Sequence, residues 1–288
     1  MAHVESARGG YHGGVAPAIS VEEVARRAEE IARDVPLSEL DELAGGAPHL
    51  RIDDLHAGYG QMEILHGLSL RVGHKQALCL IGPNGAGKST VLHSIFGFTN
   101  IYAGTIATER GGNKIDVTRL SSNEKLRTGG IAYILQDKSV FPGMTVEENL
   151  WMGGYLMGNP GEAKRAAEKV FDKYPRLAAR RKHAARVLSG GERRLLEISR
   201  ALVMDPQILL VDEPSIGLEP RFIDAVFEIL GDLQHKEGKT IVIVEQNAKK
   251  GLEFADIGYV LVSGRLALAG RAEDLLANPD VSRLFLGG

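Results

Sequence analysis

The chain has 288 residues, of which 44% are hydrophobic and 25% charged, so it can bury a full core as one large α/β domain or two small ones. Its formal net charge of −3 and the lack of a Lys/Arg stripe argue against non-specific binding to nucleic acid. No apolar run approaches the roughly 18 residues that span a bilayer, and no apolar segment after Met1 has the form of a secretory signal peptide. We therefore expect a cytoplasmic chain whose partners are proteins or a nucleotide.

The first 48 residues are predicted to form an extension before the main domain. Ser20-Val21-Glu22-Glu23 has the form of a capping box, and apolar residues follow it at helical spacing. Residues 37–43 can add another turn or two of helix, and Gly45-Gly46-Ala47-Pro48 is a linker. The main domain is then expected over residues 49–288.

The main domain alternates between short apolar strands and helical patterns. In chain order we predict a strand, turn and strand from Leu50 with the turn at Gly58-Tyr59-Gly60, a buried strand over 76–81, a helix over 87–96, a strand over 131–135, helical patterns over 146–157 and 162–174, a helix over 192–204, a strand over 208–211, a helix over 221–237 and a strand over 240–244. This alternation predicts a mainly parallel sheet covered by helices, with a helical insert at about 140–190.

Cys79 is the only cysteine, so the chain cannot form an internal disulfide, and a reducing compartment fits it. It lies within the predicted buried strand over 76–81. This position favours a small core side chain over a redox sensor.

A phosphate-binding loop follows that buried strand and opens the next helix. It fits G-x-x-x-x-G-K-[ST] in the context that gives the pattern meaning. Its glycines let backbone N–H groups converge on a phosphate at a helix N-terminus, Lys88 adds a positive charge, and the Ser89 hydroxyl can ligate Mg²⁺. The predicted ATP-binding residues of the loop are Gly82, Pro83, Asn84, Gly85, Ala86, Gly87, Lys88, Ser89 and Thr90.

Two acidic residues end the predicted strand over 208–211. Asp212 is placed to hold Mg²⁺, and Glu213 is one residue nearer to the phosphates, where it can orient and polarise an attacking water. Without a phosphate loop, the same Asp-Glu-Pro sequence would be read as ordinary surface acids after a strand.

A second helix N-terminus suited to an anion is formed by Ser189, Gly190 and Gly191. Taken alone, this segment would be a helix start with Ser189 as the N-cap. Together with the phosphate loop and the acidic strand end, however, it resembles the ATP-binding cassette (ABC) family. The signature of that family is matched by Leu188, Ser189, Gly190, Gly191 and Glu192, its Walker A motif by 82–90, and its Walker B motif by 207–212.

The resemblance covers about residues 50–288 and implies a P-loop NTPase of ABC type, an α/β fold with an antiparallel β region near its N-terminus. It implies that the signature closes over the ATP of a second subunit, so the working unit is a dimer. It also implies that Tyr59 stacks on adenine and that Gln136 reaches Mg²⁺ and couples to a transmembrane subunit. The plain alternatives are an exposed turn tyrosine and a solvated strand-end glutamine.

Two positions depart from the family pattern. Glu219 stands where aspartate is commoner, and Gln246 stands where most members have histidine. Glutamine can donate to a phosphate and accept from water, but it cannot carry a proton, so one reading is a site that only holds nucleotide. Because Glu213 is present, we favour an active ATPase with Glu213 and Gln246 in the catalytic site.

The segment around Gln246 resembles one of the two ATPase subunits of bacterial branched-chain amino-acid importers, as do residues 140–150 and the short C-terminal end from Leu275. This resemblance implies two permease subunits, a sister ATPase, a solute-binding protein acting indirectly, no nucleic acid, and a place on the cytoplasmic face of the membrane. Alternatives left open are an importer of urea or amides and a soluble cassette ATPase such as a metallocluster-assembly factor. A phosphate-loop kinase would leave the signature without a role.

Overall fold

The computed structural model of the chain describes residues 26, 35–136 and 139–286. The capping box expected at Ser20 and the helix after it lie outside these residues. Within the described residues, no helix is both long and apolar enough to cross a membrane.

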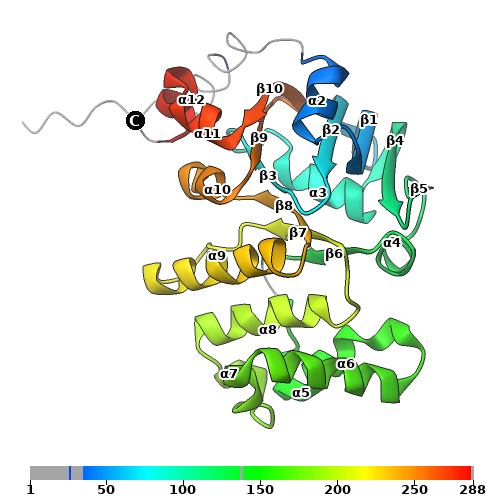
Figure 1. Cartoon of the computed structure of the whole chain (residues 1–288), viewed down its shortest axis with the longest axis vertical. Helices are drawn as coiled ribbons and strands as arrows, with labels where there is room; N and C mark the ends of the chain where they lie inside the picture. Colours follow the sequence, from blue (N-terminus) through cyan, green and yellow to red (C-terminus); the bar gives the residue numbers. More distant parts are fainter. Residues whose placement is uncertain (1–25, 27–34, 137–138, 287–288) are drawn as a thin grey trace, which may run out of the picture.

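Among the described residues, the larger of two sheets has six strands in the order β10-β9-β3-β8-β7-β6 (Figure 1). Neighbouring strands pair in parallel from β9 to β6, and only β10 runs antiparallel to its neighbour β9. Its strands are β3 (Ala77–Ile81), β6 (Ile131–Ile134), β7 (Ile208–Asp212), β8 (Thr240–Val244), β9 (Ile257–Val262) and β10 (Arg265–Arg271). The predicted mainly parallel sheet is confirmed, while the β9–β10 hairpin is an addition to the elements predicted from the sequence.

The smaller sheet is antiparallel and comes from the N-terminal part of the main domain. Its order is β2-β1-β4-β5. The strands are β1 (Pro48–Tyr59), β2 (Met62–Gly73), β4 (Asn100–Arg110) and β5 (Asn113–Asp116). The expected antiparallel region near the N-terminus is therefore present.

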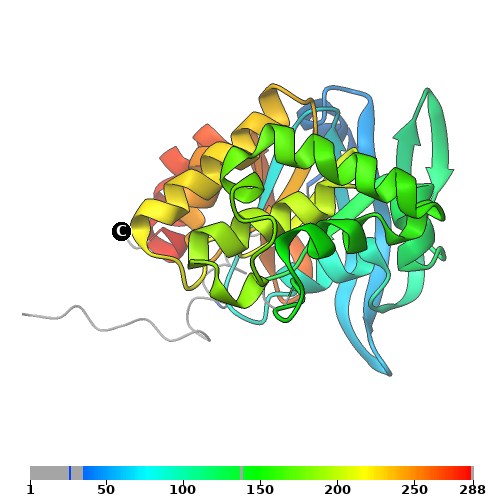
Figure 2. The same ribbon diagram turned by 90° about the horizontal axis from the view of Figure 1, so that it is seen from below.

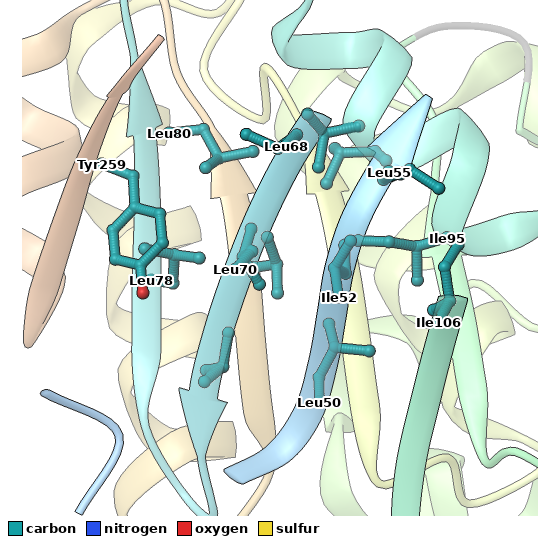
Figure 3. Close-up of a cluster of buried hydrophobic side chains, with 14 of the residues drawn as sticks. Leu50, Ile52, Leu55, Leu68, Leu70, Leu78, Leu80, Ile95, Ile106 and Tyr259 are labelled. Carbon is teal, nitrogen blue, oxygen red and sulfur yellow. The ribbon is translucent and has the colours of Figure 1, made fainter. Parts of the chain in front are cut away.

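The central strands have short apolar sequences because both of their faces are covered. Every residue of β3, β7 and β8 is buried, and their side chains alternate between two cores. Leu78 and Leu80 of β3 face the smaller sheet, as Figure 3 shows, whereas Cys79 belongs to the core on the opposite face. Cys79 is thus a buried core residue, as its strand position predicted.

Helix α3 packs between the two sheets, and α8 to α12 cover the other face of the larger sheet. The helices of this main body are α3 (Lys88–Phe96), α4 (Ser122–Arg127), α8 (Gly190–Leu202), α9 (Pro220–His235), α10 (Ala248–Phe254), α11 (Ala272–Ala277) and α12 (Pro279–Phe285). Helix α8 begins at Gly190, two residues before its predicted start, because Ser189 rather than a later residue caps it.

A group of short helices lies on the side of α8 away from the sheets, and Figure 2 shows this group in front. It contains α5 (Val146–Gly153), η1 (Tyr155–Met157), α6 (Pro160–Lys173), α7 (Pro175–Ala178) and η2 (Ala185–Val187), which share a separate core with α8. The predicted helix over 146–157 is divided in two, because α5 ends with Gly154 as its C-cap and the chain continues as the 3-10 turn η1. Gly153 and Gly154 pack against α8 and α6 too closely for a side chain.

Helix α2 (Leu37–Leu43), from the predicted N-terminal extension, packs against β2 and β10. Leu40 is fully buried in the core between the sheets. The Asp41 carboxylate accepts a hydrogen bond from Nε of buried Arg71 over 2.9 Å, and the Gln76 amide donates to Leu43 O over 2.8 Å. This helix therefore contributes core contacts, although its residues precede the predicted start of the main domain at 49.

Candidate ATP site

The phosphate loop connects β3 to α3 and fits only around glycine at its first position. Gly82 has φ 148°, and a Cβ placed there would lie 2.2 Å from Leu261 O of β9. The loop borders an open cavity of about 510 Å³. Tyr59, Ile64, Asn84, Gly85, Gly87, Lys88, Ser89, Thr90, Glu213, Ile216 and Gln246 line this cavity.

The Lys88 side chain is folded back onto its own loop. Its ammonium donates to Gly82 O over 2.8 Å and to Pro83 O over 2.9 Å, and the residue is only 9% exposed. Burial lowers the pKa of Lys88, while the negative charges of Glu213 and Asp212 oppose that shift. These two hydrogen bonds stabilise the loop. When a phosphate binds, the Lys88 ammonium can donate to phosphate oxygens in place of the two carbonyl oxygens.

Asp212 joins the phosphate loop to the end of β7. Ser89 Oγ donates to Asp212 Oδ1 over 3.2 Å, and the Tyr133 hydroxyl donates to Asp212 Oδ2 over 2.8 Å. Asp212 is 5% exposed, and burial followed by the Asp212 charge raises the pKa of Tyr133, which keeps this phenol a donor. A hydroxyl and a carboxylate thus converge as the oxygen ligands that Mg²⁺ prefers.

Glu213 is held in a strained backbone conformation beside the same cavity. Its φ is 43°, in the left-handed region that costs a non-glycine residue of order 1–3 kcal/mol. Its N–H donates to Val244 O over 2.8 Å, and the Gln136 amide donates to Glu213 Oε2 over 3.0 Å. Burial raises the pKa of Glu213, and the charges of Asp212 and Glu245 add to the shift. Such a carboxylate is more basic than an ordinary glutamate.

The structure brings Gln136 to Glu213 because β6 and β7 are parallel neighbours that end at the same edge of the sheet. Gln246 follows β8, the next strand, and lines the 510 Å³ cavity together with Lys88 and Glu213. Three loops that are far apart in the sequence therefore meet at the phosphate loop.

Tyr59 lies at the end of β1 and lines the rim of the cavity, where it is 43% exposed. Its hydroxyl is hydrogen-bonded to Nδ1 of His93 on α3, and the two rings meet edge to face. Burial lowers the pKa of His93, which favours its neutral form. An exposed, oriented tyrosine ring at the rim of a phosphate cavity can accept a planar base.

The signature segment lies at the start of α8, and none of its residues lines this cavity. Ser189 Oγ accepts from Glu192 N over 3.3 Å, and the Glu192 carboxylate accepts from Ser189 N over 2.9 Å, which completes a capping box. A Cβ on Gly191 would lie 2.4 Å from the Phe222 ring of α9. Ser189 and Gly190 are exposed, whereas Leu188 is anchored in the helical core.

Three residues at the site were not predicted from the sequence: Tyr133, His93 and Glu245. Tyr133 bonds Asp212 from β6, His93 bonds Tyr59, and Glu245 accepts from Ser215 Oγ over 2.7 Å. Tyr133 could have been found, since it lies three residues before Gln136 on a strand that pairs with β7. The other two contacts depend on how α3 and the loop after β7 pack.

The residues 65–216 match the family model described as ABC transporter. The branched-chain amino acid transport ATP-binding protein BraG of Pseudomonas aeruginosa is 39% identical over 83% of this chain and its own full length. The probable branched-chain amino acid transport ATP-binding protein LivF of Archaeoglobus fulgidus is 37% identical over 83% of this chain and 98% of its own. A nucleotide-free ATP-binding cassette from an ABC transporter matches with TM-score 0.72 and 28% identity, over 84% of this chain and 100% of its own.

The chain belongs to the ABC transporter family. It is the ATP-binding cassette of that family, a nucleotide-binding ATPase, as the three motifs predicted. The expected α/β P-loop fold with an antiparallel β region is confirmed as well.

Proposed function

We propose that this chain is the ATPase subunit of an importer for branched-chain amino acids, bound to the cytoplasmic face of the plasma membrane. The observation that carries the proposal is that Lys88, Ser89, Glu213 and Gln246 line one open cavity, to which Asp212 is joined through its hydrogen bond with Ser89 Oγ. The names of the relatives BraG and LivF support the substrate class.

In this proposal ATP binds with its phosphates on the loop over 82–90 and its adenine on Tyr59. Lys88 leaves the carbonyl oxygens of Gly82 and Pro83 for the β- and γ-phosphates, which suits a buried amine that already bonds two oxygen acceptors. Ser89, Asp212 and Gln136 fit Mg²⁺, because they offer oxygen donors at the edge where β6 and β7 end. The ion would neutralise charge on the phosphates.

Glu213 is assigned as the general base. It takes a proton from water as the water oxygen bonds to the γ-phosphorus and the bond to the ADP oxygen breaks, which yields ADP and phosphate. The partly buried position and the raised pKa of Glu213 support this role. Gln246 lines the same cavity and orients the γ-phosphate and the water through its amide.

The signature 188–192 is assigned to the ATP of a second cassette. Its exposed Ser189 and Gly190 sit at a helix N-terminus, where backbone N–H groups favour an anion. The second cassette is proposed to be a sister subunit, on the resemblance of the segment around Gln246, and a homodimer is the alternative.

The transporter is proposed to contain two permease subunits, one of which docks on a cavity of about 390 Å³ between the larger sheet and the helices over 140–190 of this chain. Phe141, Met152 and Tyr155 line this cavity and are exposed. We assign these helices as a helical subdomain of the cassette over 49–288, and residues 1–48 as an extension. A solute-binding protein delivers the substrate to the permease, and no nucleic acid takes part.

The proposal is tested by uptake of radiolabelled leucine in cells that lack the gene and are complemented with either the wild-type chain or Lys88→Ala. We expect leucine uptake with the wild-type chain only. Restored uptake of urea or a short amide without leucine would move the assignment to the alternative importer class. Uptake with Lys88→Ala at the wild-type rate would contradict the ATPase role.

A further inference from the structure

Tyr59 is held by its hydroxyl, although much of its side chain is exposed. The residue is 43% exposed at the rim of the 510 Å³ cavity, and its hydroxyl is hydrogen-bonded to Nδ1 of His93 on α3. The two rings meet edge to face, with their centroids 6.1 Å apart and their planes at 82°. An exposed tyrosine without such a bond exchanges rapidly between rotamers. The bond to His93 therefore selects one orientation of a ring that would otherwise move.

The backbone beside Tyr59 has little freedom of its own. The carbonyl of the next residue, Gly60, accepts from the Asn100 amide over 3.0 Å and from the Tyr102 hydroxyl over 3.1 Å. The main freedom left to Tyr59 is therefore rotation of its side chain. The hydrogen bond to His93 restrains that rotation.

His93 is itself fixed near the end of α3. Its carbonyl oxygen accepts from Gly97 N and from Phe98 N, each over 2.8 Å. Its ring packs edge to face against Phe98 and against Tyr133 of β6, and the centroids are 5.8 Å apart in both pairs. Because His93 is held in this way, it can give the Tyr59 hydroxyl a fixed partner.

Helix α3 also begins at the phosphate loop. Lys88 and Ser89 lie in its first turn, and His93 follows Ser89 by four residues, about one helical turn. One helix therefore joins the residues beside the phosphate cavity to the residue that directs Tyr59. A nucleotide contacts both ends of such a site at once. A site in which both ends are already in place loses less conformational entropy when the nucleotide binds.

We propose that His93 is a positioning residue that orients Tyr59 for stacking on the base of ATP. The inference rests on the proposed function, in which Tyr59 carries the adenine. His93 is not among the residues that line the 510 Å³ cavity, so it acts through Tyr59 rather than by touching the nucleotide. The contribution of His93 is to the affinity for the base. Phosphate binding at the loop and the hydrolytic step do not depend on the bond between His93 and Tyr59.

The test compares ATP with tripolyphosphate, a probe that resembles the phosphates of ATP but has no base. His93→Phe keeps a ring in the aromatic packing and removes the hydrogen bond, and Tyr59→Phe removes the same bond from the other side. In calorimetric titrations of the full chain with Mg²⁺, we expect each variant to bind ATP about fivefold more weakly and tripolyphosphate within about twofold of wild type. The double variant should bind ATP no more weakly than either single variant, because both changes remove one bond.

His93→Asn tests the bond itself, because the asparagine amide can take about the place of Nδ1 and form a hydrogen bond with the Tyr59 hydroxyl. This variant should bind ATP within about twofold of the wild-type chain. In steady-state assays of the transporter complex, His93→Phe should raise KM for ATP about fivefold and leave kcat within about twofold. A general loss of stability would not produce this separation of KM from kcat.

His56→Phe is the matched control. His56 lies on β1, as Tyr59 does, and its Nδ1 is hydrogen-bonded to Glu63 Oε1 over 2.7 Å, but neither residue lines the 510 Å³ cavity. The control therefore loses a histidine hydrogen bond from the same strand. Its affinity for ATP and for tripolyphosphate should stay at the wild-type value.

Wild-type affinity for ATP in both His93→Phe and Tyr59→Phe would overturn the proposal, and so would an equal loss of ATP and tripolyphosphate binding. A His93→Asn variant that binds ATP as weakly as His93→Phe would also contradict it. Tyr59→Ala separates these failures from a failure of the proposed function. If Tyr59→Ala binds ATP as the wild-type chain does, the base does not stack on Tyr59, and that part of the proposed function has failed. If Tyr59→Ala loses ATP affinity while His93→Phe does not, only the inference about His93 has failed.

Discussion

The phosphate loop and the signature are both glycine-rich helix starts, yet their surroundings differ. The loop is surrounded by its own chain: Lys88 bonds two loop carbonyls, Ser89 bonds Asp212, and Glu213 lies in the same cavity. The signature is held by its capping box and by a hydrogen bond from Arg180 Nε to Glu192 Oε1 over 3.2 Å, and it leaves Ser189 exposed. An anion at the loop meets the Lys88 ammonium and the Ser89 hydroxyl with Glu213 in the same cavity, whereas an anion at the signature meets backbone donors and one hydroxyl.

This difference indicates that the two regions have different roles. We call the phosphate loop with the residues around it the loop side, and residues 188–192 the signature side. Burial and charge tune the loop side, where the pKa of Lys88 is lowered and that of Glu213 is raised. On the signature side, hydrogen bonds from Ser189 lower the pKa of Glu192, which is the mark of a helix cap rather than of a reactive group. Changes on the loop side should therefore alter chemistry, and changes on the signature side should alter assembly.

The largest effect is expected from Glu213→Gln on the loop side. The variant keeps the shape of the side chain and its contact with Gln136 but removes the base, so ATP turnover should fall by about 10²–10⁴-fold. ATP affinity should be preserved, and a closed dimer should accumulate in ATP, which size-exclusion chromatography can measure. Turnover at the wild-type rate would remove Glu213 from its assigned role.

A smaller effect is expected from Ser189→Ala on the signature side. The variant loses a helix cap worth about 1 kcal/mol and the proposed contact with a second subunit's ATP, so turnover of the complex should fall about tenfold. ATP affinity of the isolated chain should not change, because the loop cavity is untouched.

Ser121→Ala is the matched control, because Ser121 and Glu124 form the same capping box at the start of α4. The two variants should lose similar stability in a urea titration, and only Ser189→Ala should lose turnover. Equal turnover in both would reduce the signature to a helix cap.

The loop side could be predicted from the sequence further than the signature side. The strand over 76–81 and the phosphate loop form one local sequence pattern, and the end of the strand over 208–211 with Asp212 forms another. They meet because β3, β8 and β7 are parallel neighbours whose carboxyl ends lie at one edge of the sheet. Gly191 shows what the sequence could not predict. A side chain at this position would clash with the ring of Phe222, which is 31 positions further along the chain, so the requirement for glycine comes from tertiary packing. The packing of α2 through Arg71 and the β9–β10 hairpin are likewise set by tertiary contacts that no local pattern expresses.

The response to pH should separate the two sides as well. Because the pKa of Glu213 is raised, its carboxylate takes up a proton at a higher pH than an ordinary glutamate, and turnover should decline first as pH falls from neutral. The pKa of Glu192 is lowered in the folded chain. The stability that its ionised carboxylate contributes is therefore complete at every pH above the ordinary pKa of a glutamate, and it is lost only as the pH falls below that pKa. Activity should therefore fall in a window where thermal unfolding of the Ser189 cap region is unchanged, which parallel ATPase and calorimetric scans can measure.

The smallest effect is expected where this chain departs from most of its family, at Gln246. Gln246 lines the loop cavity, but Glu213 beside it can accept the proton, so a side chain that only donates and accepts hydrogen bonds is sufficient there. Gln246→His should keep turnover within a few fold of wild type, whereas Gln246→Ala should lose about tenfold because it removes the hydrogen-bonding group altogether. Steady-state ATPase assays of the two variants decide the point: complete loss in Gln246→His would show that the glutamine amide, rather than the Glu213 carboxylate, limits catalysis on the loop side.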